Sequence, residues 1–145
     1  MAIRAVIFDI GGVLIDVDWD TYRKCEQAGV AASDIFRSYE QLNIELAQFV
    51  GSLHPRYKVA TICNGGSCEA LNRKFRLSEL VDLMLFDGEE GISKPDARIY
   101  QRALTRLGVQ PHEAIFVDDK QCNVEAAQCP GDVCCLLQKH RAGYC

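Results

Sequence analysis

Residues 4–16 constrain the fold most strongly, because a short apolar run there leads to one carboxylate and two glycines. The run 5–8 is too short for a typical helix and is closed by turn residues, which is typical of a strand buried on both faces. Open α/β sheets bind their ligands at the carboxyl ends of such strands, where Asp9 stands. Gly11 and Gly12 allow the backbone to turn closely over a ligand of Asp9. The alternative is an ordinary Asx turn without a ligand.

The same pattern of an apolar run followed by polar residues recurs along the chain. Further strands are expected over residues 57–62, 83–86, 114–117 and 133–137. Helical spacing of apolar residues predicts helices over residues 19–28, 33–53, 67–75 and 95–107, and a short helix that includes 124–127. Strands that alternate with helices predict a single α/β domain over residues 1–145, with a parallel sheet, helices on both faces and right-handed crossovers.

Capping and turn residues set the expected helix ends. Ser33 is the expected N-cap of the helix that ends near residue 53. Pro95 is expected at the first position of its helix, and Gly108 is expected to end that helix. Residues 87–91 contain two glycines and are expected to form a loop.

Charge and hydropathy exclude several classes of protein. A net charge of −4 and a pI near 5.3 argue against a surface for nucleic acid or anionic membranes. No run approaches the ~18 apolar residues of a membrane span, and the N-terminus lacks the apolar region of a signal peptide. We therefore expect a cytoplasmic protein whose partners include neither nucleic acid nor membrane; the sequence does not indicate an oligomeric state.

Eight cysteines are unusual for such a chain, and five of them fall in the last 24 residues. Cys63 and Cys68 are spaced as the start of a zinc site, but no clean second pair stands at ligand spacing. A secreted disulfide scaffold would not show strand–helix alternation. We expect free buried thiols, with a zinc or redox protein as the weaker alternative.

Polar groups follow the expected strands and should meet at one edge of a parallel sheet. These groups are Asp9, Cys63, Asn64, Lys94, Asp118 and Asp119. Three carboxylates repel one another, which favours a hard divalent cation with oxygen ligands, and Mg²⁺ fits best. A lysine beside them suits a phosphate, whose oxygens the backbone N–H groups of residues 11–12 and 65–66 could cradle. This combination makes an aspartyl-phosphate mechanism feasible.

With these motifs the sequence resembles the haloacid dehalogenase-like (HAD) hydrolase superfamily, from residue 3 to about residue 128. The matching motifs are residues 8–14, residues 62–64, Lys94, and Asp118 with Asp119. Residues 91–100 and 117–119 followed by Asn123 are especially similar to the family. Four motifs in the right order argue against a Rossmann-like domain with unrelated acidic loops.

The resemblance implies a role for each matched residue. Asp9 would be the nucleophile, and Lys94 would neutralise phosphate charge and hold Asp9. The phosphate-binding residues would be Gly12, Cys63, Asn64 and Lys94. The Mg²⁺ ligands would be Asp9, the backbone carbonyl of Gly11, Asp118, and Asp119 directly or through water.

The resemblance also implies a Rossmann-like core, a five-stranded parallel sheet in the order 5-4-1-2-3 with the first strand central. Relatives with a helical cap insert it between the first two motifs, where only residues 17–56 are available here. Because the helix ending at residue 53 can belong to the core, we expect a stunted or absent cap and a site open to water. The family likeness fades into a cysteine-rich segment, residues 129–145.

Two substitutions depart from the family pattern. Gly11 stands where the phosphatases carry a second aspartate, which protonates the leaving group and later activates water; its loss should cost on the order of 10² to 10⁴ in rate. Cys63 stands in place of a serine or threonine, and a thiol is the weaker donor. Cys63 would also be open to oxidation if Lys94 and Mg²⁺ lowered its pKa, although the neighbouring carboxylates oppose that.

The leading hypothesis is a slow, Mg²⁺-dependent phosphate monoester hydrolase that acts on a small phosphorylated molecule or a phosphorylated macromolecule. The alternative is a catalytically impaired HAD-like protein that binds a partner or a phosphorylated ligand, which Gly11, Cys63 and the reduced cap favour. Retention of Asp9, Lys94, Asp118 and Asp119 argues for the enzyme. The dehalogenase reaction is not expected, because that subgroup differs after its nucleophile and needs no metal.

Overall fold

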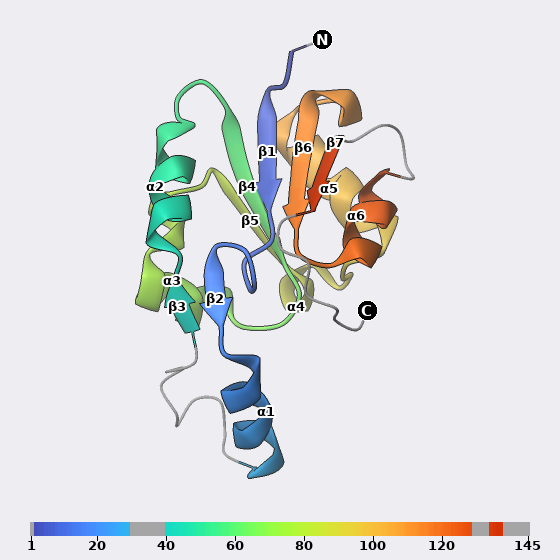
Figure 1. The fold of residues 1–145 in the computed structure, drawn as a ribbon. Helices are drawn as coiled ribbons and strands as arrows, with labels where there is room; N and C mark the ends of the chain where they lie inside the picture. Colours follow the sequence, from blue (N-terminus) through green and yellow to red (C-terminus); the bar gives the residue numbers. More distant parts are fainter. Residues whose placement is uncertain (1, 30–39, 129–133, 138–145) are drawn as a thin grey trace.

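A five-stranded parallel sheet forms the centre of the computed structural model, which describes residues 2–29, 40–128 and 134–137 (Figure 1). Its strands in spatial order are β5 (Leu83–Phe86), β4 (Lys58–Cys63), β1 (Ala5–Phe8), β6 (Ala114–Asp118) and β7 (Cys134–Leu137). Every adjacent pair is parallel. Counted along the chain, this is the predicted arrangement, with the first strand in the middle.

The register of β1 shows why the strand ends meet at one edge of the sheet. Ala5 pairs with Lys58 of β4 and Ala114 of β6, and Phe8 pairs with Thr61 of β4 and Val117 of β6. All four residues of β1 are buried, as the apolar run predicted. Asp9 therefore leaves the sheet beside the last residues of β4 and β6.

Helices cover both faces of the sheet (Figure 1). On one face lie α5 (Ala97–Leu107) and α6 (Gln121–Gln128), and α5 buries the predicted stripe of Ile99, Ala103, Leu104 and Leu107. On the other face α2 (Ile44–Ser52) packs Val50 into a cluster with residues of β1 and β4. The helix before β4 therefore belongs to the core.

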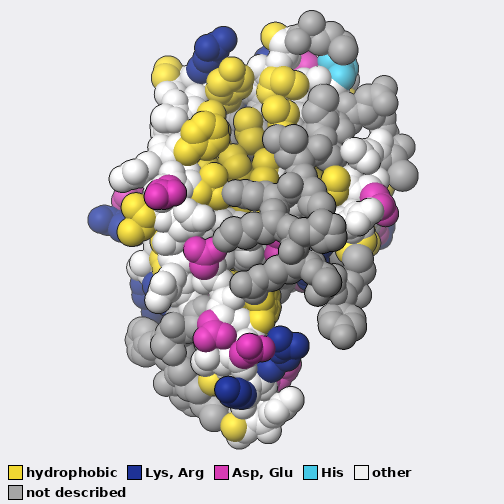
Figure 2. All heavy atoms as spheres, in the orientation of Figure 1, with side chains coloured by type: hydrophobic (Ala, Val, Ile, Leu, Met, Phe, Trp, Pro, Cys, Tyr) yellow, Lys and Arg dark blue, Asp and Glu magenta, His cyan; other side chains and the backbone are white. Residues whose placement is uncertain are grey.

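A small insert, β2 (Ile15–Val17), α1 (Trp19–Gln27) and β3 (Glu40–Leu42), leads from β1 to α2. β2 and β3 form a separate antiparallel pair, and α1 projects beyond the carboxyl edge of the main sheet (Figure 1). None of the nine residues of α1 is buried. Acidic and basic side chains gather together over α1 (Figure 2). The insert is the stunted cap that was expected.

The prediction of one helix over residues 33–53 is wrong for residues 40–43, and residues 33–39 lie outside the described part. Gln41 pairs with Asp16 across the two strands of the insert, which holds this stretch extended. The side chain of Asn43 then accepts a hydrogen bond from the Leu46 N–H at 3.0 Å and starts α2. The helix therefore starts at Ile44, after the Asn43 N-cap, and is shorter than predicted.

Two local predictions around the third strand also need correction. Residues expected to form a loop make a one-turn helix, α4 (Asp87–Glu90), which Gly91 ends in the left-handed conformation. Pro95 does not open α5, because Asp96 is the N-cap and accepts a hydrogen bond from the Arg98 N–H at 2.9 Å. The other short elements are α3 (Cys68–Phe75) and the 3₁₀ helices η1 (Leu77–Glu79) and η2 (Pro111–Glu113).

The cysteines follow the prediction only in part. Cys25, Cys63 and Cys68 are free thiols as predicted, but of these three only Cys63 is buried. The prediction is wrong for Cys122, which is disulfide-bonded. The side chains of the other four cysteines lie outside the described part, as does residue 133, the first of the predicted last strand. Across the described ranges, every helix is too short or too polar to cross a membrane.

Candidate active site

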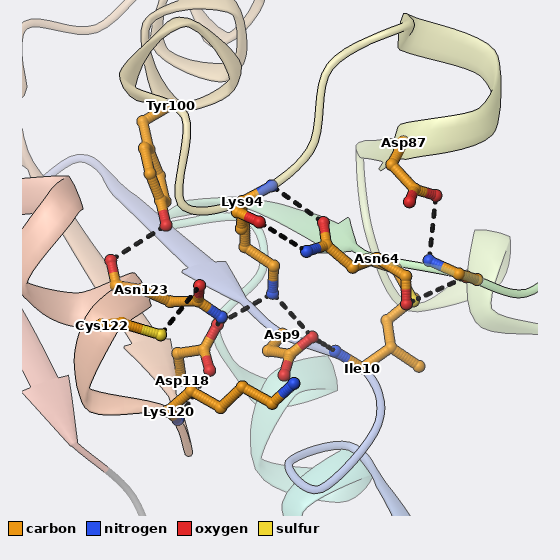
Figure 3. Close-up of polar contacts among 12 residues, drawn as sticks. Asp9, Ile10, Asn64, Asp87, Lys94, Tyr100, Asp118, Lys120, Cys122 and Asn123 are labelled. Carbon is orange, nitrogen blue, oxygen red and sulfur yellow. Dashed lines mark hydrogen bonds and ion pairs between the residues drawn. The ribbon is translucent and has the colours of Figure 1, made fainter. Parts of the chain in front are cut away.

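The predicted polar residues converge at the carboxyl edge of the sheet (Figure 3). Asp9 follows β1, and Asp118 is the last residue of β6. Lys94 comes from the loop between α4 and α5 and reaches between these two carboxylates. Asn64 follows β4 and lies against the backbone of Lys94. The structure therefore brings together polar residues that the strand-end argument placed at this edge.

Lys94 is the buried cation of this cluster. Its side chain is 1% exposed, and its Nζ lies 2.8 Å from Asp9 Oδ1 and 2.8 Å from Asp118 Oδ2. Burial by itself lowers the pKa of an ammonium group, but the two carboxylates outweigh it and raise the pKa of Lys94 above its usual value. Lys94 is therefore charged and holds both acids.

Asp9 is fixed by two donors on the same oxygen. Its Oδ1 accepts hydrogen bonds from the Ile10 N–H at 2.7 Å and from Lys94. Burial and the charge of Asp118 raise the pKa of Asp9, and the opposing effect of Lys94 only reduces that shift. A further cation near Asp9 would favour the ionised form that a nucleophile needs.

Asp118 is held by residues whose roles the sequence did not reveal. Asn123 Nδ2 donates to Asp118 Oδ2 at 3.0 Å, and the Lys120 N–H donates to Asp118 Oδ1 at 2.9 Å. The Tyr100 hydroxyl in turn donates to the Asn123 carbonyl at 2.9 Å. The sequence feature that could have indicated this role is the position of Asn123, five residues after Asp118 and inside the first turn of α6.

Three carboxylates form the candidate metal site. Asp9, Asp118 and Asp119 each offer an oxygen, and these oxygens lie within 4.8 Å of one another. Asp119 Oδ1 is buried and has no hydrogen-bond partner among the described residues. Burial first, and then the charges of Asp9 and Asp118, raise the pKa of Asp119 to about 7. A buried oxygen without a donor in an all-carboxylate set fits a hard divalent cation such as Mg²⁺.

The two glycines after Asp9 have different surroundings. Gly12 has a φ of +85°, and a Cβ built there would collide with the Asp119 carboxylate. Its N–H, expected at the phosphate, donates to the Ile15 carbonyl at 2.7 Å instead. Gly11 lies outside the positive-φ region, and a Cβ there would meet only Val17 Cγ2, at 3.8 Å. Only glycine at position 12 leaves space for the Asp119 carboxylate, whereas a side chain fits at position 11.

The loop after β4 is hydrogen-bonded to the backbone of Lys94. Asn64 Oδ1 accepts from the Lys94 N–H at 2.9 Å, and Asn64 Nδ2 donates to the Lys94 carbonyl at 2.7 Å. The Gly65 N–H donates to Asp87 Oδ1 at 2.9 Å, so it too is engaged. The amide of Asn64 thus holds the backbone from which the Lys94 side chain starts.

Cys63 is a buried, protonated thiol. Burial, with a further contribution from the charge of Asp9, raises the pKa of Cys63 to about 12. This is the opposite of the lowered pKa that would make the thiol prone to oxidation. The Cys63 Sγ lies 3.4 Å from the Gly65 carbonyl, to which it can donate.

A cavity of about 250 Å³ adjoins the cluster and joins two kinds of surface. Its polar end includes Asp9, Asn64, Lys94 and Asn123, and Gly11 and Cys63 also line it. Its other walls come largely from the insert and α3, and the residues there are Ile15, Val17, Trp19, Tyr22, Glu40 and Leu71. We expected the site to be open to water, but residues of the insert form a wall on this side of the cavity.

A family model described as haloacid dehalogenase-like hydrolase matches residues 28–131, which include Lys94, Asp118 and Asp119. A phosphorylated carbohydrates phosphatase from Thermotoga maritima is 36% identical over 89 residues, 60% of this chain and 40% of the phosphatase. An (S)-2-haloacid dehalogenase 4A from Burkholderia cepacia is 37% identical over 73 residues, 49% of this chain and 32% of the dehalogenase. The chain spans less than half the length of either relative.

Solved structures resemble the chain over almost its whole length. A HAD family enzyme from Bacteroides thetaiotaomicron, in complex with magnesium and inorganic phosphate, has a TM-score of 0.79. It is 18% identical to this chain, and the match covers 95% of each chain. At this identity the likeness shows a common fold.

Proposed function

The chain belongs to the haloacid dehalogenase-like hydrolase family, and from this premise we propose that it slowly hydrolyses phosphate monoesters with Mg²⁺, through an aspartyl-phosphate (acyl phosphate) intermediate on Asp9. The observation that carries the proposal is the buried ion-paired group in which Lys94 bridges Asp9 and Asp118 at 2.8 Å. A carboxylate oriented beside a buried cation is suited to attack a phosphate dianion, since the cation compensates the charge of both reactants.

Lys94 and the turns around it would bind the substrate phosphate. The ammonium group would neutralise phosphate charge while keeping its contact with Asp9. Asn64 supports this role through the backbone of Lys94, and Cys63, which lines the cavity, would border the phosphate oxygens. When held by Asp9, Asp118, Asp119 and the Gly11 carbonyl, Mg²⁺ would neutralise charge on the phosphate and on the carboxylates.

The chemistry proceeds in two displacements at phosphorus. A carboxylate oxygen of Asp9 forms a bond to phosphorus while the ester P–O bond breaks, and its electron pair stays on the leaving oxygen. Since Gly11 offers no acid, that oxygen takes its proton from water. A water molecule then attacks phosphorus, the bond to Asp9 breaks, and the released proton goes to solvent. Without an acid and base at position 11, both displacements are slow, and substrates with good leaving groups react fastest.

One observation favours a different function, a phosphate-binding protein without turnover. Gly11 carries no carboxylate although the surrounding space accepts a side chain. Asp9, Lys94, Asp118 and Asp119 would still hold a cation and a phosphate in such a protein. Dehalogenation, the reaction named for one relative, is less well supported, because a triple-carboxylate cluster suits a metal that this reaction does not use.

Phosphatase activity is tested with phenyl phosphate and Mg²⁺, comparing the wild type with Asp9→Asn, which keeps the size of the side chain. We expect wild-type turnover that chelation of the metal abolishes, and a loss of at least about 10³-fold in the variant. A folded wild type that binds beryllium fluoride with Mg²⁺ but turns nothing over would support the binding function. A protein that neither binds nor hydrolyses would refute both.

A further inference from the structure

We propose that Trp19 and Tyr22 of the insert form a leaving-group subsite that selects phosphate esters of a single, uncharged ring. This rests on the proposed function, because it assumes that the phosphate lies at the Asp9 end of the cavity. The observation behind it is the division of the cavity: ion pairs at one end, and apolar and aromatic walls at the other. A substrate that spans the cavity must match both ends.

The aromatic pair is placed by the start of α1. Asp18 is the N-cap, and its carboxylate accepts hydrogen bonds from the N–H groups of Asp20 and Thr21, each at 3.1 Å. Trp19 and Tyr22 stand three residues apart, so they share one face of the helix. Their rings are edge to face, with centroids 5.8 Å apart and planes at 79°. They therefore offer a shaped aromatic wall.

The burial of α1 indicates that these rings do more than pack a core. Both rings are half-buried, and none of the nine residues of α1 is buried. The charged side chains of α1 include Asp20, Arg23, Lys24 and Glu26, and acidic and basic groups together cover this part of the surface (Figure 2). The aromatic residues of the helix are the ones that line the cavity. Half-exposed aromatic walls of a cavity are typical ligand contacts.

Charge restricts the leaving group. Among the residues that the structure describes, and away from the paired Asp9 and Lys94, the charged residues that line the cavity are one acid, Glu40, and one base, Lys120. Their formal charges cancel, so the walls do not favour a second anionic group on the substrate. The cavity of about 250 Å³ has room for a phosphate that carries one ring.

Binding can be measured without turnover, because Trp19 is the only tryptophan of the chain. With Mg²⁺ present, phenylphosphonate and methylphosphonate are titrated while Trp19 fluorescence is recorded. We expect the phenyl compound to change the emission at about tenfold lower concentration, and Tyr22→Ala to remove most of that preference. The control is Phe49→Ala, which removes an aromatic side chain of α2 that is 54% exposed. This variant should keep the preference for phenylphosphonate. Equal affinity of the two phosphonates would overturn the proposal.

Kinetics separate the subsite from the chemistry. Acetyl phosphate has a good leaving group but no ring, so it reports on the Asp9 end alone. Trp19→Ala should lower kcat/KM for phenyl phosphate about tenfold and for acetyl phosphate less than twofold, while Trp19→Phe should keep most of the phenyl activity. Equal losses on both substrates would mean that Trp19 only supports the fold, and would refute the subsite. If the wild type hydrolyses neither substrate, the proposed function fails, and the fluorescence preference still decides the subsite.

Discussion

The two ends of the cavity are built in different ways. At one end, Asp9 and Asp118 stand at the carboxyl ends of the central strands β1 and β6 and hold Lys94 between them, and each of the three is less than 10% exposed. At the other end, Trp19 and Tyr22 stand on a helix that buries none of its residues. Catalytic groups need positions fixed to within a fraction of an ångström, whereas apolar contacts tolerate more variation. We therefore expect the core to support the proposed chemistry and the insert to shape what reaches it.

Removing the buried cation should produce the largest effect at the rigid end. Lys94→Met keeps the length of the side chain but leaves Asp9 and Asp118 buried beside each other without a counter-charge. We expect a loss of about 3–5 kcal/mol in the free energy of unfolding, measured by urea denaturation without metal. Phenyl phosphate turnover should fall to background in the same variant.

The exposed Lys120, which lies near the same cluster, gives the matched control for this effect. Its side chain is solvent-exposed, so Lys120→Met should change the stability by no more than about 0.5 kcal/mol. Similar losses in the two variants would show that burial of the ion pair is not what makes Lys94 important.

Gly11→Asp should have the next largest effect, and it increases activity. A carboxyl group there could donate a proton to the leaving oxygen and later accept one from water. Turnover of an alkyl phosphate such as glycerol 2-phosphate should rise by one to several factors of ten. The substitution is sterically allowed, because the new Cβ would make only an ordinary contact, with Val17.

Two companion variants sharpen this experiment. Gly12→Ala should lose activity and stability, because its Cβ collides with Asp119 and its φ is +85°. Gly11→Asp combined with Asp9→Asn is the inactive reference. A folded Gly11→Asp protein that is no faster than this reference would contradict the enzyme and leave the phosphate-binding function.

Residues that follow the strands were predictable from the sequence because burial on both faces imposes an uninterrupted apolar run. That signal predicted the positions of Asp9 and Asp118, whereas Lys94 comes from the loop between α4 and α5. The sheet order was predicted from the family resemblance. The insert was less predictable. Its strands are three residues long and depend on pairing between residues distant in the chain, such as Asp16 with Gln41.

Hydrogen bonds within the site also escaped prediction, because they depend on how loops approach in space. Asn64 was expected at the phosphate, but its amide is occupied by the backbone of Lys94. The N–H of Gly12 was expected there as well and binds the Ile15 carbonyl. Asn123 received no role from its spacing, yet it holds Asp118. Spacing identifies which residue types converge but not which of their atoms remain available.

Asn64→Ala tests whether Lys94 must be held by the Asn64 side chain for activity. The two hydrogen bonds of the amide fix the backbone at Lys94, and a displacement of ~1 Å of a catalytic group can cost about 10²-fold. We expect kcat for phenyl phosphate to fall about 10- to 100-fold with little change in KM. Asn72→Ala, which removes a side-chain acceptor for the Ser78 N–H at an exposed site, is the control and should leave kcat unchanged. A rise in KM without a fall in kcat would assign Asn64 to substrate binding instead.

Mg²⁺ binding can be followed by stability alone, without turnover, and it distinguishes the two ends of the cavity. If the ion binds Asp9, Asp118 and Asp119, a concentration 100 times Kd stabilises the folded state by about 2.7 kcal/mol, which raises the Tm by roughly 5–10 °C. Asp118→Asn should remove most of this increase, because it replaces one ligand of a charged set by a neutral amide. Asp20→Asn removes an acid of α1 that is 81% exposed and should keep the full increase. Since an ion bound by scattered surface carboxylates would stabilise both variants alike, an undiminished Tm increase in Asp118→Asn would place the ion outside the cluster and remove the metal from the proposed mechanism.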